Sequence, residues 1–420
     1  MNDAEAAEYL RTASGRGYKL GLERVTELTR RLGNPQEKLS VIHIAGTNGK
    51  GSVGAMLAAI LQKAGYRTGH FASPALCSPH EYFRINGRTA SPEQFAETLT
   101  AVQEQAEQMD DLPTEFEIIA AAAYTMFAKE QCKYAVIECC MGGDSDCTNI
   151  IASPQLSVIT NVRKDHCAYL GNTLPEIAAH KAGIIKQNRP VLTGCRNKAV
   201  LRVIREKAET LHATLYQPDD TLNIIRMTPE GTDCISRDFG KLRLGLPGAY
   251  QPENAAIVLR AVKLLRQQGL QIPDEAVRSG LAECRWQARM EVLRNNPYVI
   301  FDGAHNPDGM QKAAETLTCC FGAKQSLTFV IGVMADKEYE QYPAMLRPLA
   351  AQIYTVTPDS PRALDAAALA EVFASACIPA AACSSVDEAL TAALGTGNSV
   401  IGLGSLYLYC AFRNAAEKLI

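Results

Sequence analysis

A glycine-rich turn with a single lysine lies early in the chain and reads Gly46, Thr47, Asn48, Gly49, Lys50, Gly51 and Ser52. An apolar run at 41–45 precedes this turn, and a helical pattern at 53–64 follows it. Such a segment directs backbone N–H groups and a helix N-terminus toward one point, where a polyphosphate can bind. Lys50 supplies a positive charge, and Ser52 supplies a hydroxyl suited to magnesium. The turn therefore predicts a site for ATP and Mg2+, although Gly51 separates the lysine from the serine, unlike in the common phosphate loop.

Carboxylate and imidazole side chains follow two further apolar runs. Glu138 ends the run at 134–138, and Asp165-His166 comes shortly after the run at 156–160. Ligands of parallel sheets bind at the carboxyl ends of the strands, so we expect Glu138 to hold magnesium rather than to cap a helix. His166 is a candidate metal ligand oriented by its aspartate neighbour, and a purely structural role for it stays open.

The second half of the chain carries another strand-to-helix turn, at 301–307. Asp302 is suited to accept from a ribose hydroxyl, and His305 is suited to contact substrate or phosphate; the alternative is that both residues cap the turn. Arg289 lies just before this segment and is predicted to stabilise charge on the phosphates. Lys181, by its spacing, is an ordinary lysine on the solvated face of a helix.

Apolar runs alternate with helix-length amphipathic segments through most of the sequence. Runs at 41–45, 134–138, 156–160 and 191–194 predict a mostly parallel sheet with helices on both faces. Residues 211–246 break this pattern and predict an antiparallel excursion at the sheet edge.

A second alternating series begins near residue 290, with strands expected at 298–302, 327–333, 353–356 and 399–403. The chain is therefore expected to form an α/β fold. It would comprise a P-loop domain at 1–289 and a smaller, Rossmann-like α/β domain at 290–420.

Composition narrows the class of protein. The chain has 420 residues, 47% of them hydrophobic, which is enough for two domains with large cores. A formal net charge of −3 argues against nucleic acid or an anionic membrane as a partner. The N-terminus has no leader pattern and no apolar stretch is long enough to span a bilayer, so a cytoplasmic location is expected. The 14 cysteines are scattered, which predicts buried free thiols.

Several ordered segments resemble folylpolyglutamate synthase and the related dihydrofolate synthase, members of the Mur ligase superfamily. The matching segments cover nearly the whole chain and include 21–25, 46–52, 84–87, 114–117, 146–149, 165–166, 181–186, 289–293, 302–307, 332–337 and 404–407. The resemblance implies an ATP-dependent amide ligase. In such an enzyme an acceptor carboxylate takes the γ-phosphoryl group, and the amine of L-glutamate then attacks the acyl phosphate.

The resemblance also assigns roles to single residues. Lys50 and the loop backbone would hold the phosphates, Ser52 and Glu138 would bind one magnesium ion, and His166 would bind a second. Lys181 matches a lysine that becomes carbamylated and supports magnesium. Asn254, Arg289 and Asp302 match residues that contact ATP. His305 lies in the same turn of the family pattern, beside them. Residues 1–289 would be the ATP-binding domain and 290–420 the glutamate ligase domain of a monomer.

Departures from the family pattern lie around the expected acceptor site. Asp144 stands where the family has Arg, Ala75 stands where it has His, and Cys167-Ala168 replaces Thr-Asp. The acceptor is therefore open between a folate and another aromatic or pterin-like acid, and a non-catalytic ATP-binding paralogue is a third hypothesis. A GTP-driven switch is disfavoured because no guanine-reading Asn-Lys-x-Asp segment follows a predicted strand. A phosphate-loop kinase is disfavoured because it needs no second α/β domain beginning at 302–307.

Overall fold

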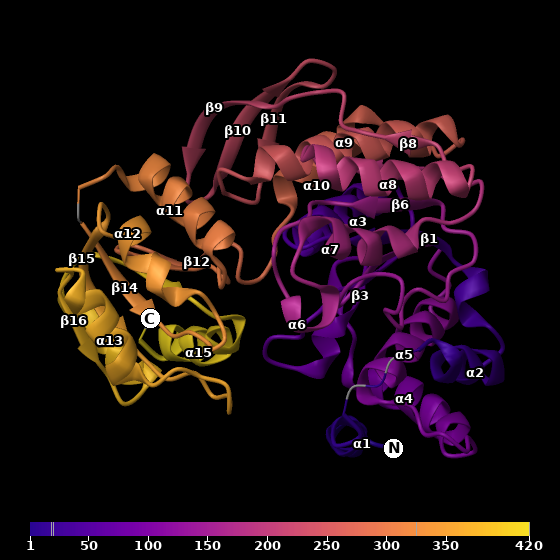
Figure 1. Ribbon diagram of the computed structural model, residues 1–420, viewed down its shortest axis with the longest axis horizontal. Coiled ribbons are helices and arrows are strands. Elements are labelled where there is room, and N and C mark those ends of the chain that lie inside the picture. The colour runs from indigo at the N-terminus through magenta and orange to yellow at the C-terminus, as the bar shows by residue number, and fades with distance from the viewer. Residues whose placement is uncertain (18, 20, 325, 420) are drawn as a thin grey trace. The chain divides into compact units, whose positions relative to one another are not determined.

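The computed structural model describes residues 1–17, 19, 21–324 and 326–419, and the chain divides into two compact units. The first comprises 1–222 and 253–283, and the second comprises 223–252 and 284–420. The prediction of an α/β fold with a mostly parallel sheet and a second α/β domain is confirmed. Figure 1 shows each sheet with its helices. Among the described residues no helix is long and apolar enough to cross a membrane.

The first unit is built on an eight-stranded sheet in the order β4-β3-β2-β5-β1-β6-β7-β8. Its strands are β1 (Ser40–Ala45), β2 (Thr68–Phe71), β3 (Phe83–Ile85), β4 (Arg88–Thr89), β5 (Tyr134–Glu138), β6 (Leu156–Ile159), β7 (Val191–Thr193) and β8 (Leu215–Tyr216). Six strands run parallel, and β3 and β4 add an antiparallel edge. The helices are α1 (Asp3–Ser14), α2 (Glu23–Arg31), α3 (Lys50–Lys63), α4 (Pro92–Ala106), α5 (Glu115–Lys129), α6 (Cys167–Leu170), α7 (Leu174–Lys181), α8 (Lys198–Thr210), α9 (Gln251–Gln267) and α10 (Asp274–Glu283).

Strand alternation divides the first unit into two helical layers. Ala135 and Ile137 of β5 belong to the apolar cluster that α1, α4 and α5 complete. The intervening residues face α3: His70 of β2 pairs with Val136 of β5, and its ring lies against Gly54 of α3. Because successive strand residues point to opposite faces, Glu138 lies on the α3 side of the sheet.

The second unit has a six-stranded sheet in the order β12-β13-β17-β14-β15-β16, with only β12 antiparallel to its neighbour. Its strands are β12 (Glu291–Asn295), β13 (Tyr298–Phe301), β14 (Leu327–Ile331), β15 (Ala350–Thr355), β16 (Ala380–Ala382) and β17 (Ser399–Leu403). Its helices are α11 (Pro307–Phe321), α12 (Tyr342–Leu346), α13 (Ala366–Ser375), α14 (Val386–Gly395) and α15 (Tyr409–Leu419). Ile300 points into the cluster with α11 and α13, whereas Phe301 packs on Phe412 of α15.

The antiparallel excursion was predicted as part of the main sheet edge, and this placement is wrong. Strands β9 (Asn223–Thr228), β10 (Gly231–Ser236) and β11 (Gly240–Leu244) form a separate three-stranded sheet, grouped with the second unit. Their antiparallel pairing is confirmed.

The cysteine prediction holds in part. The 14 cysteines, all within the described residues, are free thiols. Six of them are buried and four are exposed, including Cys140 and Cys319, so burial is not general.

One close helix contact offers a test of packing in the first unit. A Cβ atom on Gly280 of α10 would lie 2.8 Å from Ile60 Cα of α3, a backbone atom that cannot move alone. We expect Gly280→Ala to lower the free energy of unfolding by about 1–3 kcal/mol through overpacking. The measurement is the urea midpoint. Gly395→Ala in α14 is the control: that site opens to space, so Ala is expected to be neutral or to stabilise by up to about 1 kcal/mol. Equal midpoints for both variants would contradict the contact.

Candidate functional site

The turn after β1 has a backbone shape that only glycine fits. Gly46 has a φ of 155°, and a Cβ there would lie 1.9 Å from Thr160 Oγ1. Gly49 has a φ of 84° and caps the start of α3, where a Cβ would lie 2.6 Å from Asn254 Oδ1. The turn is therefore wedged between the end of β6 and α9, and Asn254 lies against it.

Residues just after β6 brace this turn. The Thr47 amide donates to Asn161 O at 3.0 Å, and the Asn48 amide donates to Asn161 Oδ1 at 2.8 Å. Thr160 Oγ1 donates to Asn48 O at 2.7 Å. Two amides that the sequence suggested for phosphates are thus engaged within the protein. The sequence analysis did not predict a role for Asn161. Its position as a polar residue shortly after a core strand could have indicated one.

A buried cation and carboxylate meet at the start of α3. Lys50 Nζ lies 3.7 Å from Glu138 Oε1, and the Lys50 and Glu138 side chains are only 15% and 5% exposed. Lys50 also folds back to donate to Gly46 O at 3.1 Å. Ser52, in the first turn of α3, is buried as well. The sequence prediction that Glu138 stands at a strand end beside the glycine-rich turn is confirmed.

Lys181 joins this group from the C-terminal end of α7. Its spacing suggested a solvated lysine, and that expectation is wrong, because its exposure is 4%. Burial, and after it the positive charge of Lys50, lower the pKa of Lys181 to about 8. Lys181 and Lys50 are therefore close enough to interact electrostatically. The chain continues directly from Lys181 into η3 (Ala182–Ile184). Spacing did not reveal the burial of Lys181, because the pattern within one helix does not show what packs against its end.

His166 has a more open position. It precedes α6 with a φ of 50°, a left-handed conformation that few non-glycine residues adopt. Its side chain is about half exposed, and its Nε2 lies 3.9 Å from Asp165 Oδ2. Its amide donates to Asp165 Oδ1 at 3.0 Å. The expected orientation of His166 by Asp165 is thus a loose contact.

Asp302 is a buried carboxylate of the second unit that several hydrogen bonds hold in place. It follows β13, is 3% exposed, and accepts from the amides of Met290 and Ala304, each at 2.9 Å. Tyr250 Oη donates to it at 3.3 Å. Burial raises the pKa of Asp302, and Arg289 opposes that shift. Tyr250 is a partner that the sequence reading did not assign.

Arg289 and His305 lie next to the same turn. Arg289 Nη1 donates to Ala288 O at 2.9 Å, and a Cβ on Gly303 would lie 2.7 Å from this nitrogen. His305 Nδ1 donates to Gly303 O at 2.7 Å. The structure thus groups three predicted residues of the second unit, Arg289, Asp302 and His305, at the carboxyl end of β13.

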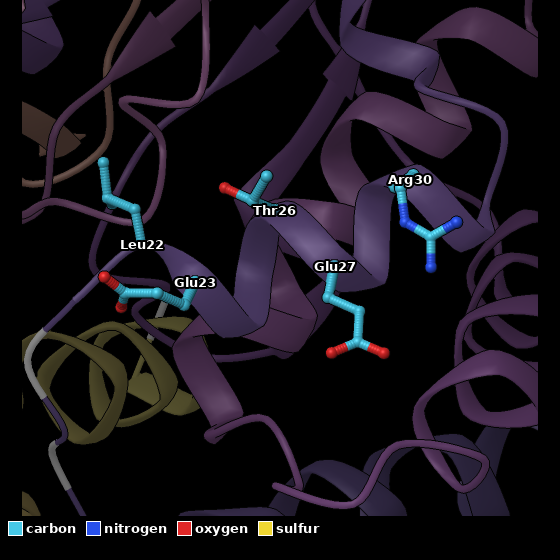
Figure 2. A pocket seen from close by; sticks show the side chains of 5 residues that line it. All are labelled: Leu22, Glu23, Thr26, Glu27 and Arg30. Carbon is cyan, nitrogen blue, oxygen red and sulfur yellow. The ribbon is translucent and has the colours of Figure 1, made fainter.

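A surface pocket lies on α2. Figure 2 shows its lining side chains, which are Leu22, Glu23, Thr26, Glu27 and Arg30. They come from the helix and the residue before it, so the pocket is a feature of one element. None of the predicted site residues lines it.

Comparisons with known proteins show which family this fold belongs to. The Mur ligase middle domain matches residues 44–262, and the Mur ligase glutamate ligase domain matches residues 288–405. The crystal structure of Mycobacterium tuberculosis folylpolyglutamate synthase with ADP and AMPPCP superposes with a TM-score of 0.88 at 29% identity, covering 100% of this chain and 99% of that one.

Two curated relatives are similar along most of their length. The dihydrofolate synthase/folylpolyglutamate synthase of Bacillus subtilis is 37% identical over 360 residues, 83% of each protein. The folylpolyglutamate synthase of Lacticaseibacillus casei is 33% identical over 431 residues, 98% of each. The chain therefore belongs to the Mur ligase family and, within it, to the folylpolyglutamate and dihydrofolate synthases.

Proposed function

We propose that this protein is an ATP-dependent ligase that joins L-glutamate to a carboxylate acceptor, as a folylpolyglutamate synthase, a dihydrofolate synthase or both. The observation that carries the proposal is the buried Lys50–Glu138 contact at the end of β5, with Lys181 beside it. A cation and a carboxylate held there suit the triphosphate and a metal ion together. The names of the relatives in Bacillus and Lacticaseibacillus support the choice of reaction.

The chemistry has two steps. An oxygen of the acceptor carboxylate attacks the γ-phosphorus of ATP, the bond to the β-phosphate oxygen breaks, and ADP leaves an acyl phosphate. The glutamate amine then attacks the acyl carbon, phosphate departs, and the amine loses a proton as the amide forms. Phosphoryl transfer mainly requires alignment and neutralised charge, which Lys50 and the glycine turn at 46–52 would provide.

Magnesium fits the residues that are present. The Ser52 hydroxyl and the Glu138 carboxylate are oxygen ligands of the kind magnesium prefers, and both are buried beside Lys50. Magnesium at this place would neutralise charge on the phosphates. A second magnesium at His166 belongs to the proposal; the half-exposed imidazole is a softer donor than the oxygen ligands at the first site.

Lys181 is proposed to be carbamylated. Only a neutral amine reacts with carbon dioxide, and a pKa of about 8 leaves more of Lys181 neutral than the ordinary value of 10.5 would. The carbamate would be an anion close to Lys50, so the charge that disfavours the ammonium would favour the product. Its role would be to support magnesium through its oxygens.

The remaining assignments concern nucleotide contacts and context. Gly46, Thr47, Asn48, Gly49, Lys50, Gly51, Ser52 and Asn254 are proposed to contact ATP from the first unit. Arg289, Asp302 and His305 are proposed to do so from the second. A division into an ATP-binding domain at 1–289 and a glutamate ligase domain at 290–420, a monomeric state and a cytoplasmic location also stay predictions.

A non-folate acid is the second candidate acceptor. Asp144 replaces the family's Arg, and in this structure it binds His180 at 2.9 Å. An arginine that would present a cation near the acceptor is therefore replaced by a carboxylate that contacts a histidine of the same unit. This observation favours an altered acceptor pocket with the ATP chemistry retained.

Acceptor-dependent ADP release tests the proposed reaction. The protein is mixed with ATP, magnesium and L-glutamate, and with dihydropteroate, tetrahydrofolate or a simple aryl acid in turn. We expect release only when glutamate and a pterin-containing acceptor are both present. Release with the aryl acid alone would favour the second candidate, and no release with any acceptor would support a non-catalytic paralogue.

Removing the charge of Glu138 tests its metal role. We expect Glu138→Gln, which keeps the side-chain shape, to lower acceptor-dependent ADP release by roughly 100-fold or more. Without the carboxylate the site would bind magnesium poorly, and the charge on the phosphates would not be neutralised. Glu130→Gln is the matched control, since Glu130 precedes β5 at the opposite end and pairs with Arg67. Far-ultraviolet circular dichroism verifies folding. Unchanged turnover in Glu138→Gln would remove this residue from the site.

The buried Lys181 predicts a pH-dependent stability. Its pKa is about 8 in the folded protein and 10.5 when unfolded, so between these values the unfolded state binds more protons and stability rises with pH. Below about pH 8 Lys181 is protonated in both the folded and the unfolded state, and the folded state bears the full free-energy cost of burying the charged amine. We expect Lys181→Met to raise the free energy of unfolding by about 3 kcal/mol at pH 7, with a gain that vanishes by about pH 10.5.

Urea unfolding in buffer depleted of carbon dioxide measures this effect. Lys129→Met is the control, because Lys129 is exposed and its replacement relieves no cost of burying a charge. A Lys181→Met gain that is the same at pH 7 and pH 10.5 would show that the lysine is not buried as a destabilised cation.

A further inference from the structure

We propose that Asp144 and His180 form a clamp that positions Lys181 and Glu138 relative to each other, so that both residues of the pair are positioning residues of the ligase. This inference rests on the proposed function. The clamp is the set of contacts that joins the turn after β5 to the C-terminal end of α7.

The two residues are joined twice. His180 Nδ1 lies 3.0 and 2.9 Å from the two carboxylate oxygens of Asp144. The Asp144 amide donates to the His180 carbonyl oxygen at 2.9 Å. A single exposed contact between two polar side chains contributes little, but side-chain and backbone hydrogen bonds between the same two residues fix the turn and the helix end in one register.

Two glycines bring the turn and the helix end into direct contact. A Cβ on Gly143 would lie 2.8 Å from His180 O and 3.0 Å from Lys181 O. A Cβ on Gly183 would lie 2.3 Å from Asp144 Cα. Since neither position has room for a side chain, the backbone of the turn packs on the carbonyl groups of the residues it holds.

Asn149 closes the clamp from the far end of the turn. Its Nδ2 donates to Asp144 O at 3.1 Å and to Gly183 O at 3.2 Å. Asn149 is buried, and both of these hydrogen bonds are partly buried. The turn is therefore tied to α7 and η3 at its middle and at its end.

The clamp fixes the segments that carry two residues of the proposed site, Glu138 and Lys181. The turn starts directly after Glu138, the last residue of β5, and α7 ends at Lys181, the neighbour of His180. Glu138 and Lys181 both interact with Lys50. A shift of the turn along α7 would thus separate two groups that must act on one nucleotide, and small displacements of such groups are costly to rate.

The pairing accounts for the departure at position 144. The resembling family has Arg there, and an arginine in this chain would face the imidazole of His180 without an opposite charge. Aspartate at 144 therefore belongs with histidine at 180, because its carboxylate oxygens lie within hydrogen-bond distance of the imidazole.

The test uses three variants and two readouts. The variants are Asp144→Asn, His180→Gln and the exchanged pair Asp144→His with His180→Asp. The first readout is kcat and the KM for ATP in acceptor-dependent ADP release. The second is the rate at which acetic anhydride labels Lys181, followed by peptide mass spectrometry with exposed Lys129 as internal reference.

We expect each single variant to lower kcat by about tenfold or more with a nearly unchanged KM for ATP, because alignment and not nucleotide affinity is lost. Lys181 labelling should rise by about fivefold as the helix end loosens. The exchanged pair restores the hydrogen bond between a carboxylate and an imidazole and should bring both readouts back toward wild type. Asp274→Asn is the control, since it breaks a similarly exposed ion pair with Arg266 and should change neither.

Wild-type labelling and kcat in both single variants would overturn the clamp. So would an exchanged pair that stays as impaired as the single variants, or an equal loss in Asp274→Asn. If wild type releases no ADP with any acceptor, the proposed function fails, and the labelling rates alone then decide the clamp. If a single variant does not fold, the exchanged pair decides by the same two readouts.

Discussion

The buried contact between Lys50 and Glu138 is the interaction on which the arrangement of the first unit depends. Taking two charges out of water costs several kcal/mol per ion unless other groups compensate. Here the strand end, the glycine turn and the first turn of α3 hold the charges 3.7 Å apart. Lys181 adds a second buried cation nearby, at a cost visible in its lowered pKa. Such an arrangement lowers the stability of the folded protein, and it is typical of a site that binds a highly charged ligand.

The parallel sheet brings these groups together. Lys50 follows β1 and Glu138 ends β5, and the two strands are neighbours in register. Parallel pairing places their carboxyl ends at the same edge, and alternation sends Glu138 to the face that α3 covers. The second unit repeats the principle at the end of β13, where Asp302 is held by two amides and by Tyr250. In both units a carboxylate is fixed by the element that precedes it.

The sequence predicted most of this because its signals are local. The turn at 46–52, the strands at 134–138 and 399–403, and Asp302 after β13 follow from apolar runs and from the residues that end them. Short strands such as β2 were not predicted, since Gly69 and His70 do not form an apolar run. They are buried by distant partners: Phe127 covers Gly69, and α3 covers His70. The separate sheet of β9–β11 was misplaced for a similar reason, because hairpin pairing does not reveal which larger sheet it joins.

The sequence by itself determined the type of chemistry: a phosphate-binding turn, strand-end carboxylates and a series of motifs that resemble one ligase family. Only the tertiary structure decided the environment of individual side chains. It buried Lys181, which spacing had assigned to water, and it paired Asp144 with His180 across 36 residues of chain. The physical reason is that pKa values and ion pairs depend on distance and burial, which are set by the packing of separate elements and not by the order of residues within any one of them.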